Sequence, residues 1–272
     1  MTLNYRNRLM KTVSIISLSQ LIVFAALFLH RFITGNTIPF EFTSLTFDTS
    51  SVKAFMSTLV TPYSYAALAA TATLAVYTPL TCMIVNYVFE KTQSPEILYF
   101  LGFLAGCMVE TFRLCIPLFD LWNGYSKFLI YIGKLVFAGR ILTVLSLLFS
   151  AVFSADDKIQ EADRNLIIAI VVSVVFATAV AIDTRTILPS MMVNTSFQSF
   201  FMFARIFIAA ATVIAYLFNK KAKTMLSYVM LFSGYMCLTL AANILTAALG
   251  FIFLWIGTET YFKGLHNYYL WK

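Results

Sequence analysis

Long apolar stretches alternate with short polar breaks along the whole chain. Each stretch is close to or longer than the roughly 20 residues that an α-helix needs to cross the hydrocarbon core of a bilayer. Because backbone N–H and C=O groups must be satisfied within the segment in lipid, each stretch is expected to be a helix. The pattern predicts an all-α fold, a polytopic transmembrane helical bundle in which residues 1–272 form a single integral membrane domain.

The same pattern predicts seven spans. They cover residues 12–33, 63–89, 96–119, 127–153, 165–183, 197–219 and 225–257. The seventh is longer than the hydrocarbon core, so it either tilts, extends into water or breaks near Gly250. A break with a return of the chain gives eight helices, which is the alternative topology. The longest loop, 34–62, is predicted on the outer side of the membrane.

Composition and charge agree with this class of protein. Hydrophobic residues make up 60% of the 272 positions and charged residues 11%, whereas about a quarter of a soluble domain is charged. We therefore expect membrane lipids around the chain. The net charge of +7 is concentrated in loops on the N-terminal side, most clearly at 219–223. The positive-inside rule then predicts a multi-pass protein of the cell membrane, with a cytoplasmic N-terminus and a C-terminus outside, and no nucleic-acid partner.

Two charged residues, Glu110 and Arg113, interrupt the apolar third span. Gly102 and Gly106 precede them in a G-x-x-x-G pattern that lets helices approach closely. Steps of four, four and three residues keep all four positions on one helical face. This face is expected to contact neighbouring helices, so the two charges should point into the bundle.

Other spans place polar residues on faces that should also turn inward. The predicted spans contain one carboxylate, Glu110, and four cations: Arg113, Lys134, Arg140 and Arg205. An ionisable group at membrane depth costs at least about 2.5–3.5 kcal/mol and marks a functional site by default. Three explanations stay open: an internal ion-pair network, a site for an anion or anionic lipid, and a proton or ion pathway. The candidate ligand-binding residues are Glu110, Arg113, Arg140, Arg205, Gln198 and Asn243.

The sequence lacks the motifs of the common catalytic and cofactor sites. No H-E-x-x-H, P-loop or G-x-S-x-G pattern occurs, and the two histidines lie near the predicted outer surface. We therefore expect no enzyme activity, metal or cofactor. The leading hypothesis is a sensor-like or permease-like protein that binds a small anion or anionic lipid headgroup in an outward-facing basic cavity. The alternative is a non-catalytic structural subunit of a larger membrane complex, whose arginines pair with a membrane protein partner.

Overall fold

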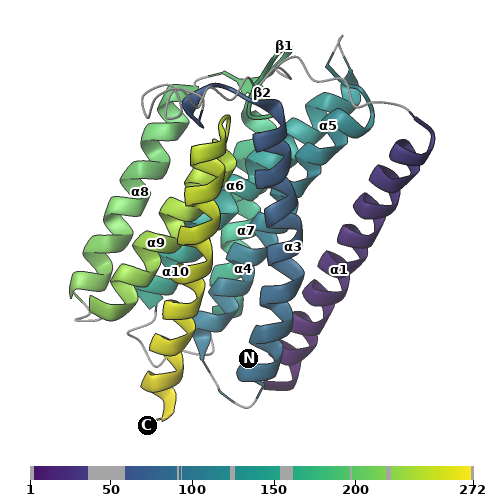
Figure 1. The fold of residues 1–272 in the computed structure, drawn as a ribbon. Coiled ribbons are helices and arrows are strands. Elements are labelled where there is room, and N and C mark those ends of the chain that lie inside the picture. The colour runs from purple at the N-terminus through teal and green to yellow at the C-terminus, as the bar shows by residue number, and fades with distance from the viewer. Residues whose placement is uncertain are drawn as a thin grey trace, which may run out of the picture.

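A computed structural model describes residues 3–35, 59–90, 92, 94–122, 126–153, 162–196, 198–218 and 222–270. These residues form a bundle of eight long helices, counting the rod Pro95–Leu118 once (Figure 1). The helices are α1 (Leu3–Ile33), α3 (Ser64–Val88), α4 (Pro95–Glu110), α6 (Lys127–Phe153), α7 (Ala162–Ala179), α8 (Gln198–Phe218), α9 (Ala222–Thr239) and α10 (Ile244–Leu270). The short helices η1 (Thr111–Leu114) and α5 (Cys115–Leu118) continue α4. The predicted all-α bundle is confirmed.

The seventh predicted span is wrong as a single helix, because residues 225–257 contain most of α9, a turn and the first half of α10. The turn lies at 240–243, and Gly250, the predicted break, lies inside α10. Glycine serves close packing there, since a Cβ on Gly250 would lie 2.7 Å from Leu238 Cγ of α9. A Cβ on Gly257 would likewise lie 2.7 Å from the backbone nitrogen of Leu231. The eight-helix alternative is therefore the one observed, with a different turn.

The extra helix changes the relation between the two termini. The start of α1 and the end of α10 lie at the same end of the bundle (Figure 1). Seven crossings predicted termini on opposite sides; with α9 and α10 as separate helices, both termini instead lie at the same end of the bundle.

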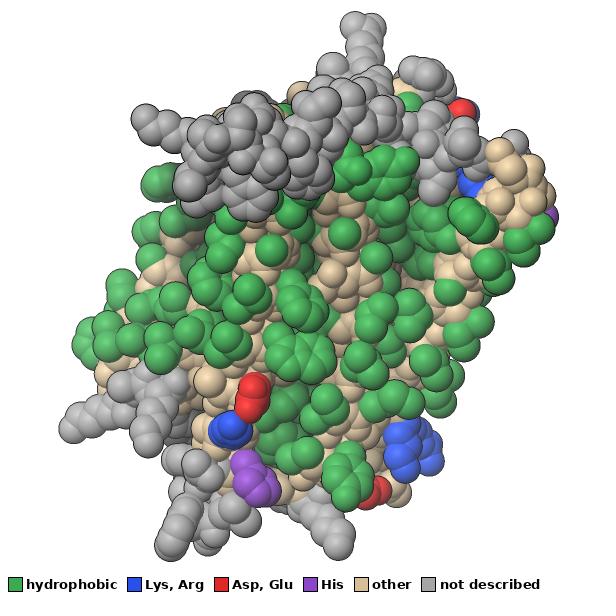
Figure 2. All heavy atoms as spheres, viewed as in Figure 1, with side chains coloured by type: hydrophobic (Ala, Val, Ile, Leu, Met, Phe, Trp, Pro, Cys, Tyr) green, Lys and Arg blue, Asp and Glu red, His purple; other side chains and the backbone are tan. Residues whose placement is uncertain are grey.

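The outer surface of the bundle is apolar. Seven of the helices are long and apolar enough to cross a membrane, and α9 contributes a shorter apolar segment, Thr224–Thr239. On the face seen in Figure 2, a band of hydrophobic side chains covers the middle of the bundle, and the visible charged groups lie towards its two ends. Helices α1 and α8 bury the least, 17% of their most apolar windows. This band is the surface that contacts membrane lipids.

A β-hairpin that the apolar pattern did not reveal lies at the end of the bundle opposite the termini (Figure 1). Strand β1 (Ile182–Leu188) pairs antiparallel with β2 (Met192–Thr195), with a register irregularity between Asp183 and Ile187. The hairpin packs on α6, where the space beside Gly133 is filled by Ile182 and Val193. The hairpin thus covers one end of the helices. The loop 34–62 lies largely outside the described residues.

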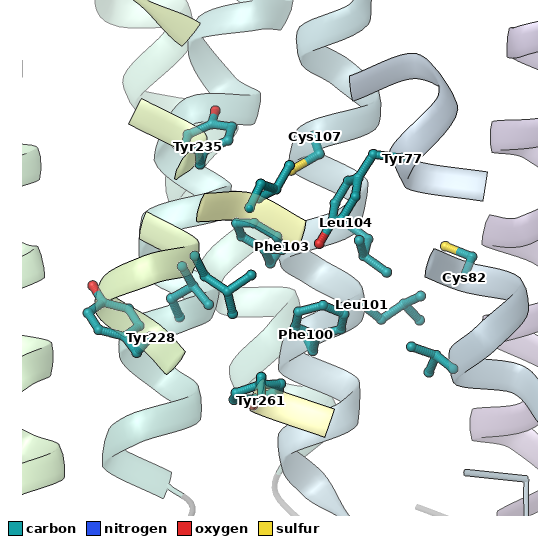
Figure 3. Packing of buried hydrophobic residues seen from close by; sticks show 14 of the residues in the cluster. Tyr77, Cys82, Phe100, Leu101, Phe103, Leu104, Cys107, Tyr228, Tyr235 and Tyr261 are labelled. Atoms are coloured by element: carbon teal, nitrogen blue, oxygen red, sulfur yellow. The ribbon is translucent and has the colours of Figure 1, made fainter. Parts of the chain in front are cut away.

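The core joins α3, α4, α9 and α10 around aromatic side chains (Figure 3). Phe100 of α4 stacks on Tyr261 of α10 with ring centroids 5.2 Å apart, and Phe103 meets Tyr235 of α9 edge to face at 5.9 Å. Such pairs add about 0.5–1.5 kcal/mol each beyond the burial of their area. This packing holds α9 and α10 against α4, the helix that ends at Glu110.

Candidate functional site

Glu110 ends α4 inside the bundle, as the glycine spacing predicted. Its side chain is 0% exposed. A Cβ on Gly106 would meet Thr143 and would lie 2.7 Å from the carbonyl oxygen of Gly139, both on α6. The absence of a side chain therefore lets α4 and α6 approach closely. This contact brings Glu110 within reach of the charged residue on α6.

Glu110 accepts hydrogen bonds from two arginines. Nη1 of Arg113 lies 2.6 Å from Glu110 Oε1, and Nη2 of Arg140 lies 2.5 Å from the same oxygen. Nε of Arg140 also donates to Oε2 at 3.0 Å. We call Glu110, Arg113 and Arg140 the Glu110 network. Bonds of this kind, with charge on both partners, are roughly twice as strong as neutral ones.

Arg113 also joins the network to α9. Its Nη1 donates to the carbonyl oxygen of Thr239, the last residue of α9, at 2.7 Å. The last carbonyls of a helix lack partners within the helix and carry its negative dipole end, which makes a guanidinium a suitable cap. Arg113 lies in the 3-10 segment η1. Pro117 favours this tightening, because proline cannot donate to, and clashes with, the carbonyl four residues earlier.

Two donors of Arg113 have no partner among the described residues. Its Nε and Nη2 are buried without a hydrogen bond. Arg113 and Arg140 line a small cavity of about 20 Å³ beneath the hairpin, together with Gly133, Met192 and Thr195. A space of this size has room for one water molecule. The small cavity can therefore hold one group that accepts from Arg113.

Arg140 also lines a larger cavity. It has a volume of about 280 Å³ and lies between α6, α7, α8 and β2. We call it the α6–α8 cavity. Arg140 and Arg205 are its charged lining residues within the described part of the chain, and Gln198 also lines it. The rest of the wall is almost entirely apolar: Phe137, Ile141, Val144, Leu145, Val172, Phe176, Met192, Thr195, Phe200, Phe201, Ala204 and Ile208.

Arg205 has few partners in this cavity. Its Nη2 contacts the sulfur of Met202 at 3.3 Å, a weak acceptor. Its Nη1 is buried and has no hydrogen-bond partner among the residues that the structure describes. The charge on Arg140 acts unfavourably on that of Arg205. The charge on Glu110 acts favourably on that of Arg205, but the buried Nη1 lacks an acceptor, which an anion can supply.

The structure separates the sequence-predicted residues into groups. Glu110, Arg113 and Arg140 form the Glu110 network, while Arg140, Arg205 and Gln198 line the α6–α8 cavity. Asn243 does not line this cavity, because its Oδ1 accepts from the backbone N–H of Thr246 at 2.9 Å and caps α10.

Other parts of the site differ from the sequence expectation. Lys134 lies outside both groups and donates to the carbonyl of Thr178 at the end of α7 at 2.9 Å. Sequence reasoning also missed the Thr239 carbonyl and strand β2. The β-branched residues of 182–187 were a signal for a strand, whereas nothing in the sequence indicated the carbonyl.

The apolar band, the eight helices and the buried charges define an integral, multi-pass membrane protein. No family model, curated protein or solved structure matches the chain. The function must therefore be argued from the site itself.

Proposed function

We propose that this protein binds an anion, or the anionic headgroup of a lipid, in the α6–α8 cavity. It acts as a sensor-like or permease-like membrane module rather than as an enzyme. The observation that carries the proposal is the buried, unpartnered Nη1 of Arg205 beside Arg140 in a cavity of about 280 Å³. A ligand that accepts hydrogen bonds from both guanidinium groups supplies the acceptor that the described residues around Arg205 lack.

The charge balance supports the same proposal. Three arginines against one glutamate leave the Glu110 network and Arg205 together with a net charge of +2. Glu110 already accepts from Arg113 and Arg140. A bound anion reduces the repulsion between Arg140 and Arg205, and the binding free energy therefore stabilises the folded state.

A structural role in a larger membrane complex is the second candidate. The Glu110 network supports it, since this network ties α4 to α6 and to the end of α9 through buried hydrogen bonds. In that role Arg205 would pair with a carboxylate of another protein. The position of Arg205 favours the first candidate, because this residue lines the same cavity as Arg140.

Ligand-induced stabilisation tests the proposal directly. The protein is placed in nanodiscs of zwitterionic lipid, and its melting temperature is measured with phosphate, small carboxylates or anionic lipid. A ligand at one hundred times its Kd stabilises the folded state by about 2.7 kcal/mol. We expect at least one of these anions to raise the melting temperature of the wild type and to have no effect on Arg205→Gln.

The matched control is Lys127→Gln, which removes the same charge from an exposed position at the start of α6. This variant should keep the full response to the anion. An unchanged melting temperature with every anion, combined with destabilisation by Arg205→Gln alone, would instead support the structural role.

The orientation is part of the proposal. Arg6, Arg8 and Lys11 lie near the start of α1, at the end of the bundle where both termini lie. The positive-inside rule assigns that end to the cytoplasm. The hairpin, and the part of the α6–α8 cavity next to it, then face the outer side of the cell membrane.

A further inference from the structure

The residues that line the α6–α8 cavity indicate the chemical class of the ligand as well as its charge. We propose that the ligand is a single-chain amphiphile, whose anionic head (carboxylate or phosphate) lies between Arg140 and Arg205 and whose apolar tail lies among α6, α7 and α8. This inference rests on the proposed function and names the class of ligand. In this inference the apolar wall of the cavity determines the selectivity among anions.

The apolar wall is too extensive for an inorganic anion. Beyond the arginines, the cavity is bounded by aliphatic side chains such as Val144, Val172 and Ile208 and by four phenylalanines. A small hydrated ion at the arginines would leave these side chains against water or an empty space. A tail would instead bring apolar atoms into close contact with them, which dispersion favours.

The volume of the cavity agrees with a ligand of this class. A water molecule takes up about 30 Å³ in the liquid, and the cavity holds about 280 Å³. This is several times the volume of a small inorganic anion. It suits a head group with one short chain, while the two chains of a phospholipid would have to extend out of it.

The cavity is open at its side, in the region that lipid surrounds. Helices α7 and α8 both pack on α6 but have little contact with each other. Phe176 of α7 and Phe200 of α8 line the cavity yet are 51% and 65% exposed. Both lie within about one turn of the helix ends next to the hairpin. An amphiphile in the leaflet at the hairpin end can therefore enter sideways, with its head directed towards the arginines.

Entry from the bilayer determines what the head group and the tail each contribute to binding. A tail that comes from the bilayer is already in apolar surroundings, so its burial contributes little net driving force. Affinity must then come from the guanidinium contacts, while the tail decides which anion fits the space. Removing one charge-assisted contact should weaken binding about 10- to 100-fold, which corresponds to about 1.4–2.8 kcal/mol.

The test compares probes that share a chain or share a charge. In zwitterionic nanodiscs, binding and melting temperature are measured with decanoate, decyl phosphate, acetate, inorganic phosphate, decanol and decyltrimethylammonium. We expect decanoate or decyl phosphate to raise the melting temperature most. Acetate and inorganic phosphate should act weakly, and decanol and decyltrimethylammonium should not act. Arg205→Gln should weaken binding of the anionic amphiphile about 10- to 100-fold.

A second variant tests the tail separately from the charge. Ala204 lines the cavity, so Ala204→Phe should fill the space for the tail and abolish decanoate binding. Ala210 is exposed on the same helix and outside the cavity, so Ala210→Phe is the matched control and should bind normally. The ligand-free melting temperature of each variant shows that it is folded. Val172→Phe on α7 repeats the test if Ala204→Phe does not fold.

The possible outcomes separate this inference from the proposed function. If acetate or inorganic phosphate binds as well as decanoate, and Ala204→Phe changes nothing, the amphiphile is wrong and the anion site stands. If decanol binds as well as decanoate, the cavity is a neutral apolar site and both proposals fail. Both also fail if no probe binds.

Discussion

Arg140 belongs to two regions of the bundle that differ in how many hydrogen-bond partners they supply to buried arginines. On one side, the Glu110 network surrounds its charges with partners: a carboxylate 0% exposed and the last carbonyl of α9. On the other side, the α6–α8 cavity leaves Nη1 of Arg205 without a partner among the described residues.

The two regions differ in how closely the neighbouring helices pack around the arginines. The Glu110 network is held by the close contact of α4 with α6, where Gly106 leaves no room for a Cβ. The cavity lies where α7 and α8 both pack on α6 but have little contact with each other. Arginines on one helix bundle can therefore serve structure or binding, depending on whether the neighbouring helices close around them. Four predictions test this distinction.

The largest expected effect concerns the side of the membrane on which each chain terminus lies, because a tag is accessible either from a given side or not at all. Tags placed before Met1 and after Lys272 should be accessible from the same side of the membrane, because α1 and α10 have their free ends together. Gln198→Cys, at the start of α8, should react with a membrane-impermeant thiol reagent added from the other side. A C-terminal tag on the side opposite to the N-terminal tag would refute the α9–α10 hairpin.

Removing the carboxylate of the Glu110 network should have the largest effect on stability. Glu110→Ala leaves Arg113 and Arg140 buried without their counter-charge, and breaking a buried pair costs about 3–5 kcal/mol. The free energy of unfolding is measured in nanodiscs. The control is Glu259→Ala, which breaks an exposed ion pair with Lys263, worth about 0–1 kcal/mol. Equal effects of the two variants would mean that Glu110 is in contact with water.

The glycine contact behind the network should show an intermediate effect. Gly106→Ala forces a Cβ against Thr143 and to within 2.7 Å of the backbone oxygen of Gly139. Overpacking of this kind costs about 1–3 kcal/mol. Gly264→Ala in α10 meets nothing within 4 Å, so it should be neutral or stabilising by up to about 1 kcal/mol through helix propensity. The sign of the two changes in unfolding free energy should therefore differ.

The smallest effect is expected in the cavity. Without ligand, Arg205→Gln should change the free energy of unfolding by less than about 0.5 kcal/mol, or should raise it, since a charge repelled by Arg140 has been removed. Arg113→Gln is the matched comparison within the Glu110 network. It loses the ion pair to Glu110 and should clearly destabilise the protein. A larger loss in Arg205→Gln than in Arg113→Gln would reverse the assignment of the two regions.

Much of the fold could be predicted from local pattern alone. Apolar length marks the helices, and the step of four residues from Gly102 to Glu110 identifies the inward face, because both depend only on neighbours along one helix. The division of 225–257 could not be found in this way. Its turn at 240–243 has no proline or glycine, and it is as apolar as the helices that it joins.

The site shows the same limit. Arg113, Arg140 and Arg205 could be recognised as inward-facing charges from their helices. The assignment of Glu110 to two of them depends on how α4 packs against α6 and where α9 ends, which are contacts between distant parts of the chain. Asn243 was grouped with these residues but caps α10 in the structure, because a helix cap and a binding residue look alike when the start of the helix is not known.

The bonds of Arg113 also set an order of events during synthesis. Its bond to Glu110 spans three residues, so it can form inside the third crossing as soon as this segment is made and can neutralise both charges there. Arg140 follows 30 residues after Glu110, whereas Thr239 is 126 residues beyond Arg113. At about 5–20 residues per second, the ribosome needs roughly 6–25 s to produce that carbonyl. For that interval the nascent chain holds a charged side chain whose last native partner does not yet exist.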